Sequence, residues 1–282
     1  MPLTPDTNQK RDLRAALFLC YDGCHMDARD FTVDTVVAAG ALVLRLREEK
    51  FETTQKGGDP KDLVTSIDFE VNDFITQKLK ETFPEDAIYS EETVGSFQEA
   101  PRLWAIDPID GSSNFSRGIP HFAICLALLT NGVPEAGAVY NPVTRECFSF
   151  KRGNGAFLNG KPIHVSSIEE LNDSFVLFHA GRKPEARAWG GRGYEALLGS
   201  AKKTSNLAGS ALDTCFVAAG RVEANIYGTG TTLDMAAAIG CLTEAGGIIV
   251  NEDGETAPLL PTPQRIIVTN NKKIADAVRA IL

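Results

Sequence analysis

The feature of the sequence that most constrains the fold is an apolar run that ends in two acidic residues. Leu103 to Ile106 are bulky and apolar, which is typical of a buried strand. Asp107 and Asp110 follow at once, and Pro108 between them removes a backbone donor and fixes the local turn. Two carboxylates at this place suit hard divalent cations, although a solvated turn after the strand is the simpler alternative.

The residues after the acidic pair favour a binding site for an anion. Gly111, Ser112 and Ser113 are suited to a tight turn or to the start of a helix. Backbone N–H groups at such a place can hold a phosphate. The stretch as a whole therefore predicts cations and a phosphate group bound side by side.

Composition limits the class of protein. The chain has 282 residues and a formal net charge of −9, which argues against nucleic acid or a membrane surface as the main partner. No apolar run reaches the length of a transmembrane helix. Six cysteines in a chain of this length do not form a disulfide scaffold. A reducing compartment is therefore favoured, and we expect the cytoplasm.

Helical and strand-like segments alternate along the chain without internal repeats. This order favours a layered α/β sandwich over a Rossmann series of βαβ units. Residues 1–28 have no sustained period and are interpreted as an N-terminal extension, so the main domain comprises residues 29–282. Its length suits two subdomains that share one site, with a boundary near residue 160.

Three local predictions concern the ends of elements. Asp62–Asp68 has the pattern of a short strand bounded by acids. Gly228–Thr232 is rich in Gly and Thr, which predicts a loop. Leu233–Ala245 is predicted to be a helix that opens with Asp234 and ends before a glycine pair.

Acidic residues recur at the ends of apolar elements. Taken singly, each has an ordinary explanation, such as a helix cap, a helix N-terminal acid or a solvated pair. As a set, beside Gly, Ser and Thr and without a competing His or Cys cluster, they indicate an oxygen-only site for Mg²⁺. Such a site next to an anion cradle suggests metal-assisted phosphoryl chemistry. The residues are Asp68, Glu91, Asp107, Asp110 and Asp234.

These residues resemble, in the same order, the motifs of the inositol monophosphatase family. The resemblance runs from about Asp30 to the C-terminus and implies the α-β-α-β-α sugar-phosphatase fold, which fructose bisphosphatase shares. It also implies a homodimer and Mg²⁺-dependent, lithium-sensitive hydrolysis of a phosphate monoester. The matching segments are Asp62–Thr65 with Asp68, Glu91–Glu92, Asp107–Gly111 with Asn114–Phe115, Arg152–Gly160, and Leu233–Asp234 with Glu244–Gly247.

The resemblance also implies ligands for two to three Mg²⁺ ions. Glu91, Asp107 and the backbone carbonyl of Ile109 would hold the first ion. Asp107, Asp110 and Asp234 would hold the second, and a third, weaker ion would lean on Glu91. Metal-bound water would be the nucleophile, because the ion lowers its pKa.

Roles for the remaining site residues follow from the same resemblance. Ser112 stands where the family usually has Thr, and its hydroxyl, with Asp68 or Thr65 behind it, would orient and deprotonate the water. The N–H groups of Gly111 and Ser112 would hold the phosphate. The implied catalytic residues are thus Glu91, Ser112, Asp68 and Thr65, and the implied substrate contacts are Asp110, Gly111, Ser112, Tyr227 and Asp234.

The alcohol side of the site departs from the family pattern. Tyr227 lies seven residues before Asp234, where inositol-specific members carry Glu, and Leu233 replaces the usual Trp. Tyr227 either lines the pocket or packs inward as a strand residue. If it lines the pocket, we expect a broader substrate range, in which inositol monophosphate is hydrolysed without strong preference.

Three functions remain open at this stage. The first is hydrolysis of inositol monophosphate or a similar polyol phosphate. The second is the activity of a 3′(2′),5′-bisphosphate nucleotidase or a fructose bisphosphatase, but the short spacing from Glu91 to Asp107 favours the first. The third is a non-catalytic cation-binding protein, which a missing metal ligand would support, and none is missing. The expected partner is a small phosphate ester, with no nucleic acid and no membrane.

Overall fold

A computed structural model describes residues 27–48, 53–55, 63–93, 97–181 and 184–282. The predicted N-terminal extension, up to residue 26, lies outside the described residues. Of the short strands at 53–55 and 63–65 only the backbone is described.

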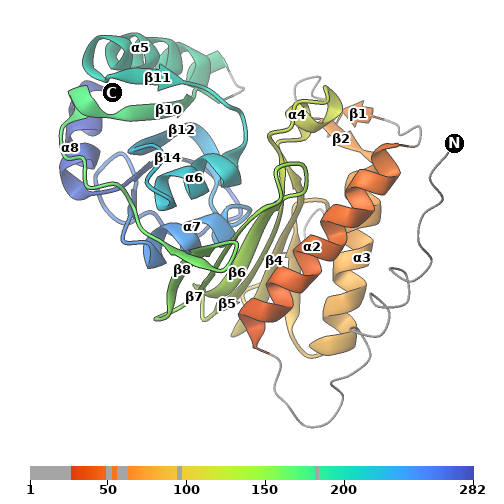
Figure 1. Cartoon of the computed structure of the whole chain (residues 1–282). Helices are drawn as coiled ribbons and strands as arrows, with labels where there is room; N and C mark the ends of the chain where they lie inside the picture. The colour runs from red at the N-terminus through yellow and green to blue at the C-terminus, as the bar shows by residue number, and fades with distance from the viewer. Residues whose placement is uncertain (1–26, 49–52, 56–62, 94–96, 182–183) are drawn as a thin grey trace, which may run out of the picture.

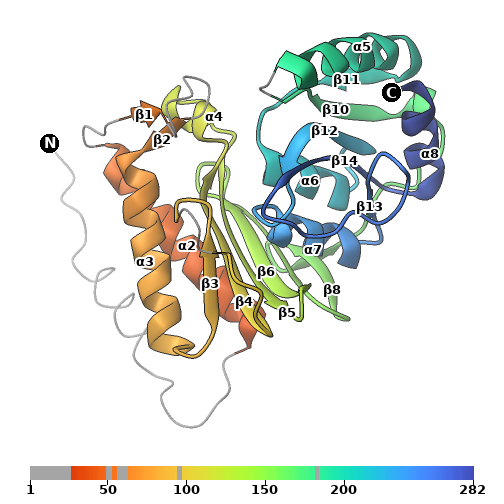
Figure 2. The ribbon, with the colours of Figure 1, turned by 180° about the vertical axis from the view of Figure 1, so that it is seen from behind.

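The chain folds into five layers, which run across Figure 1 from α2 and α3 to α5 and α8. Among the described residues, α2 and α3 cover one face of a seven-stranded sheet, α6 and α7 lie between this sheet and a five-stranded sheet, and α5 and α8 cover the outer face of the second sheet (Figures 1 and 2). In this order the helices are α2 (Ala28–Arg47), α3 (Ser66–Thr82), α6 (Ser210–Ala218), α7 (Ala236–Glu244), α5 (Pro184–Ser200) and α8 (Lys272–Ile281). The predicted α-β-α-β-α sandwich is therefore confirmed.

The seven-stranded sheet carries the acidic pair on its strand β4. Trp104 and Ile106 of β4 pack against α2 and α3, whereas Leu103 and Ala105 face α6 and α7. Both faces of the strand are thus buried, which explains the unbroken apolar run in the sequence. The strands in sheet order are β3 (Ala87–Ser90), β4 (Arg102–Asp110), β5 (Ala123–Thr130), β6 (Val133–Asn141), β7 (Glu146–Lys151), β8 (Gly155–Leu158) and β9 (Lys161–Ile163). Only the β3–β4 pair is parallel among these neighbours.

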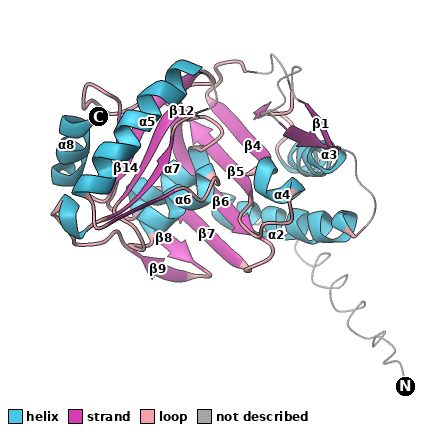
Figure 3. Cartoon of the chain, turned by 90° about the horizontal axis from the view of Figure 1, so that it is seen from above, coloured by secondary structure: helices cyan, strands magenta, loops and turns pink. Residues whose placement is uncertain are grey.

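The five-stranded sheet lies on the other side of α6 and α7 from the seven-stranded sheet, as Figure 3 shows from above. Strands β11, β10 and β12 are parallel, so their carboxyl ends lie at one edge, where ligands of α/β sheets commonly bind. The segment after β11 leads into α6, and the segment after β12 leads to Asp234. The strands in sheet order are β11 (Lys203–Ser205), β10 (Phe175–His179), β12 (Ala224–Thr231), β14 (Pro263–Thr269) and β13 (Ile248–Val250).

The three local predictions at element ends are corrected by the structure. The strand predicted over Asp62–Asp68 ends at Thr65, and α3 begins at Ser66, because Ile67 starts the buried stripe of that helix. Strand β12 continues through the predicted loop to Thr231, with a bulge after Tyr227.

Helix α7 begins at Ala236 and not at Leu233, so Asp234 precedes the helix instead of opening it. The remaining short elements are β1 (Thr53–Gln55), which pairs with β2 (Leu63–Thr65), α4 (Ser112–Ser116) and the 3₁₀ helix at Leu171–Asp173. Within the described part of the chain, no helix is long and apolar enough to cross a membrane.

Candidate active site

Two buried carboxylates mark the end of β4. Asp107 is 5% exposed and Asp110 is 6% exposed. The pairing of β4 with β5 shifts between these two residues, where Pro108 cannot donate to the ladder. Both acids therefore sit at the interrupted end of a buried strand, at the place where the sequence predicts them.

Backbone N–H groups from two directions hold these carboxylates. Asp107 Oδ1 accepts from the N–H of Ile109 at 3.1 Å. The carboxylate of Asp110 accepts from the N–H groups of Ser210 and Ala211 at 3.0 and 2.9 Å, which are the first residues of α6. The positive end of that helix also favours a negative charge. Asp110 thus joins the seven-stranded sheet to the helix layer between the sheets.

Burial and mutual repulsion shift the pKa of both acids upward. Burial raises the pKa of Asp107 well above its ordinary value, and the charges of Glu91, Asp110 and Asp234 raise it further. Burial also raises the pKa of Asp110 to about 6, although the hydrogen bond from the N–H of Ala211 lowers it. Such a group of anions is costly without a counterion.

Glu91 and Asp234 complete the acidic group. Glu91 follows β3, and its N–H donates to the carbonyl of Ile106 at 3.2 Å, which brings it beside the end of β4. Asp234 Oδ1 accepts from the hydroxyl of Tyr89 at 2.9 Å. Burial, and then the charge of Asp234, raise the pKa of Tyr89, so this phenol stays a donor. Both sheets thus contribute to one acidic site.

The turn after Asp110 requires a glycine. Gly111 has a φ of 85°, and a Cβ at this position would lie 3.0 Å from the carbonyl oxygen of His121. The next residue, Ser112, opens the short helix α4, and its Oγ donates to the carbonyl of Ile109 at 3.0 Å. The hydroxyl and the carbonyl that the family resemblance assigns to catalysis and to metal binding are therefore neighbours.

For Asp68 and Thr65, the two residues expected behind Ser112, the structure gives the element on which each lies. Asp68 is buried in the first turn of α3. Thr65 ends β2, which packs against α4, but the side chain of Thr65 lies outside the described part. Their action on Ser112 stays a prediction.

Tyr227 packs inward, which is one of the two alternatives that the sequence leaves open. The residue is 2% exposed, and its hydroxyl donates to the carbonyl of Ser210 at 2.7 Å. The side chain of Asn225 donates to the same hydroxyl. Tyr227 is therefore connected to the turn of α6 that holds Asp110, and its contact with a substrate stays a prediction.

Asn114 has a role that the sequence motifs do not reveal. Its side chain is buried, and Nδ2 contacts the carbonyl oxygens of His121, Leu207 and Ala208 at 2.8, 2.9 and 3.1 Å. It ties α4 to the segment that leads into α6. The sequence offers no signal for the contacts with Leu207 and Ala208, because these acceptors are backbone atoms 93 and 94 residues away.

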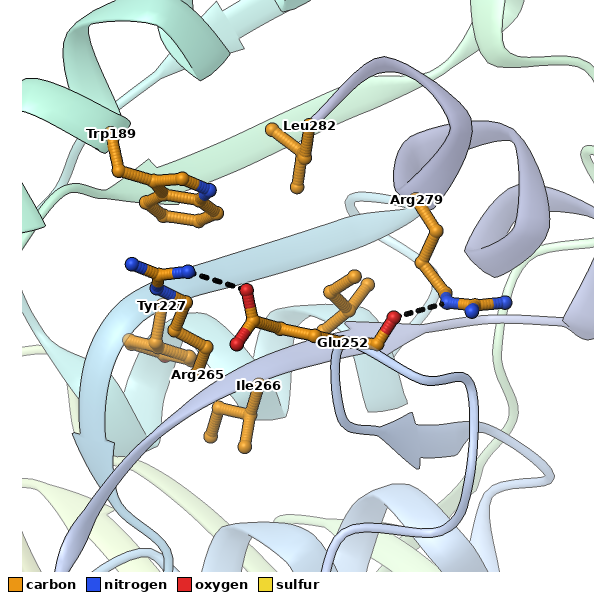
Figure 4. Close-up of a pocket in the computed structure, with 8 residues that line it drawn as sticks. Trp189, Tyr227, Glu252, Arg265, Ile266, Arg279 and Leu282 are labelled. Atoms are coloured by element: carbon orange, nitrogen blue, oxygen red, sulfur yellow. Dashed lines mark hydrogen bonds and ion pairs between the residues drawn. The ribbon is translucent and has the colours of Figure 1, made fainter.

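The outer layer holds a separate small pocket of about 90 Å³ (Figure 4). Trp189, Arg265 and Arg279 border it, and Figure 4 shows both arginines directed to Glu252. Arg265 forms an ion pair with the Glu252 side chain, and Arg279 Nε donates to its carbonyl at 3.0 Å. Tyr227 also borders this pocket, but its hydroxyl is engaged with α6. Because the two arginines are already paired, we assign the pocket no part in the acidic site.

The acidic group fits a hard divalent cation. Its donors are oxygen atoms only, and the raised pKa of Asp107 and Asp110 reports anions that a cation would stabilise. Among the described residues, no three His, Cys, Asp or Glu side chains are already gathered like metal ligands.

Comparison with known proteins identifies the family. A model of the inositol monophosphatase family matches residues 27–282. The chain belongs to this family. The membership predicted from the motifs is thus confirmed, and the match begins at Asp27, the residue that caps α2.

Relatives of known name and structure agree with this family. A fructose-1,6-bisphosphatase/inositol-1-monophosphatase of Thermotoga maritima is 32% identical over 232 residues, which are 82% of this chain and 88% of the relative. The structure of Thermotoga maritima IMPase matches with a TM-score of 0.82 at 31% identity, over 91% of this chain and 96% of that one. An IMPase/NADP phosphatase complexed with Mg²⁺ and phosphate has the same fold, with a TM-score of 0.78, 24% identity, and 98% and 96% coverage.

Proposed function

We propose that the protein is a Mg²⁺-dependent phosphatase that hydrolyses inositol monophosphate or a similar polyol phosphate. The observation that carries this proposal is the pair of buried acids, Asp107 and Asp110, joined electrostatically to Glu91 and Asp234. Two comparisons support it, since one relative is named fructose-1,6-bisphosphatase/inositol-1-monophosphatase and one structure of this fold is complexed with Mg²⁺ and phosphate.

The acidic residues would divide between two cation positions. Glu91, Asp107 and the carbonyl of Ile109 would hold one Mg²⁺, and Asp107, Asp110 and Asp234 would hold the other. A third, weaker ion would lean on Glu91. Bound Mg²⁺ would polarise the phosphoryl group and supply an activated water. Asp107 is shared by both positions, so its charge is the one that the site can least lose.

The turn at Gly111 would hold and orient the reacting phosphate. The N–H groups of Gly111 and Ser112 would donate to phosphate oxygens. The hydroxyl of Ser112 would orient the attacking water, accept its proton and pass its own proton to the group behind it, Asp68 directly or through Thr65. Support comes from the contact of Ser112 with the Ile109 carbonyl and from the packing of β2 against α4.

The packing of Tyr227 removes one aromatic face on which the base of a nucleotide substrate could stack. The imidazole of His179 stacks on the Tyr227 ring, with centroids 4.8 Å apart and planes 12° apart. That face is therefore already covered, and a nucleotide base cannot stack on it. A bisphosphate nucleotidase or a fructose bisphosphatase remains the alternative.

Phosphate release from a panel of esters tests the proposal. We expect inositol 1-phosphate and glycerol 2-phosphate to be hydrolysed in Mg²⁺ with a higher kcat/KM than 3′-phosphoadenosine 5′-phosphate. A clear preference for the nucleotide or for fructose 1,6-bisphosphate would contradict the substrate class while leaving a phosphatase. No release from any ester, in protein that binds Mg²⁺, would favour the non-catalytic alternative.

The assembly and the location expected from the sequence stay proposals. In size-exclusion chromatography with light-scattering detection, a homodimer would have about twice the chain mass of 30.4 kDa. A mass equal to that of one chain would contradict the homodimer. A cytoplasmic location is supported by the four described cysteines, which are free and buried.

A further inference from the structure

A buried carboxylate in α6 lies between two imidazole rings. Asp213 has no exposed side-chain surface. His121 Nε2 lies 2.7 Å from its Oδ1, and His179 Nε2 lies 2.8 Å from its Oδ2. Burial by itself would raise the pKa of Asp213, but the hydrogen bonds from His121 and His179 bring it below its ordinary value. An ionised carboxylate only accepts, so both rings must carry their hydrogen on Nε2.

The three residues belong to different layers. His121 lies between α4 and β5 of the seven-stranded sheet, and His179 is the last residue of β10 in the five-stranded sheet. Asp213 lies in α6, between the two sheets. One carboxylate therefore links both sheets through the helix layer. We call these three residues the Asp213 clasp.

The Asp213 clasp adjoins the turn that holds Asp110. Asp213 follows Ser210 and Ala211 within α6, and the N–H groups of those two residues donate to Asp110. The imidazole of His121 lies against Gly209, the residue that precedes the helix, since a Cβ there would lie 2.7 Å from its Cδ2. The clasp thus contacts the N-terminus of α6 from the side of the first sheet.

A second connection runs through His179. Its ring stacks on Tyr227, and the hydroxyl of Tyr227 donates to the carbonyl of Ser210 at 2.7 Å. His121 also contacts the catalytic turn, because its carbonyl accepts from Asn114 and lies against Gly111. His121 directly, and His179 through Tyr227, are therefore connected to the backbone that surrounds Asp110.

We propose that the Asp213 clasp positions the first turn of α6, and through it the carboxylate of Asp110, for binding Mg²⁺ and phosphate. The proposal rests on the function proposed above, since it concerns the same site. Asp213, His121 and His179 are positioning residues and not catalytic ones. Partners that orient metal ligands commonly change metal affinity or activity by 10- to 100-fold when they are lost. A displacement of the Asp110 carboxylate by a fraction of an ångström is enough to cause such a loss.

Variants of His179 separate the hydrogen bond from the packing of the ring. His179→Phe keeps a ring over Tyr227 and removes the donor to Asp213. His179→Gln keeps an N–H group near the position of Nε2 and removes the ring. His164→Phe is the matched control, because His164 has no contact with the clasp among the described residues. Each variant is measured as the full chain, with thermal unfolding recorded alongside.

Mg²⁺ affinity by titration calorimetry is the main readout, because it does not require turnover. We expect His179→Phe to weaken Mg²⁺ binding and to lower kcat about tenfold or more. His179→Gln should have a Mg²⁺ affinity and a kcat within about threefold of the wild-type values. His164→Phe should leave both values unchanged. If His179→Phe folds poorly, Asp213→Asn takes its place, because an amide accepts from only one of the two rings. This variant should weaken Mg²⁺ binding in the same direction.

Three results would overturn the proposal. The first is a clasp variant with a lower melting temperature but Mg²⁺ affinity and kcat within twofold of the wild type, which assigns the clasp to stability alone. The second is an equal loss in His179→Gln and His179→Phe, which excludes the hydrogen bond as the cause. The third is a wild type that does not bind Mg²⁺. If the wild type binds Mg²⁺ but releases no phosphate, the proposed function is contradicted and the clasp proposal is not. The Mg²⁺ affinities of the clasp variants, compared with that of the wild type, then still test the clasp.

Discussion

The metal-free protein should become more stable as the pH falls from 7 to 5. Burial raises the pKa of Asp110 to about 6 in the folded chain, above the ordinary value of 3.8. Between these values the folded chain binds a proton that the unfolded chain does not, so protonation favours folding. The contribution grows as the pH falls through 6 and is complete below 3.8. Asp107, whose pKa is also raised, acts in the same direction.

The size of this effect follows from the pKa difference. Six minus 3.8 is about 2 units, and at about 1.36 kcal/mol for each unit the full effect of Asp110 is about 3 kcal/mol. Of this contribution to the free energy of unfolding, about 1.3 kcal/mol is gained between pH 7 and pH 5. In a protein of this size that amounts to a shift of about 3 °C in melting temperature.

Thermal unfolding in EDTA at pH 5, 6 and 7 measures the effect, with Asp110→Asn as the comparison. The variant loses one acceptor for the N–H groups of α6, but that loss does not depend on pH. The acids with lowered pKa, Asp27 and Asp213, lose their contribution only below their ordinary value of 3.8, outside this window. We expect the wild type to gain about 3 °C over the variant between pH 7 and pH 5. If the melting temperatures of the wild type and of Asp110→Asn change with pH in parallel, the electrostatic description of Asp110 is refuted.

Three further predictions concern the same region. Gly111→Ala should lower stability by about 1–3 kcal/mol and reduce phosphate release, because of the φ of 85° and the nearby His121 carbonyl, as urea unfolding and activity assays can check. Tyr227→Phe should cost about 1–3 kcal/mol, since the fully buried side chain of Asn225 loses the hydroxyl to which it donates, and an unchanged urea midpoint would contradict this. Lithium should inhibit phosphate release uncompetitively by taking the position at Asp107, Asp110 and Asp234, and full turnover at high lithium would remove this claim.

The sequence predicts the layers and the acidic strand end better than the boundaries around them. The run from Leu103 to Asp110 is buried on both faces of β4, so its pattern is local and readable. The same burial on both faces hides the direction of Tyr227, because a period of two cannot tell which buried face a residue takes. Helix α7 begins after Asp234 and not before it, since the chain first completes a turn after β12.

Contacts between distant segments could not be predicted from the sequence. Ser210 and Ala211 donate to Asp110 across 100 and 101 positions of the chain. Asp213 meets His121 and His179 across 92 and 34 positions. Single residues at such separations have no characteristic spacing, and they become neighbours only when the helix layer packs between the two sheets.

Phosphate release from inositol 1-phosphate, with and without Mg²⁺, tests the central claim most directly. Phosphate should be released in Mg²⁺, should cease in EDTA and should return when Mg²⁺ is added again. Asp107→Asn should lower kcat by several orders of magnitude, because one carboxylate would be lost from both cation positions. Full activity in EDTA, or in Asp107→Asn, would contradict a reaction that depends on cations held by the buried acids of β4.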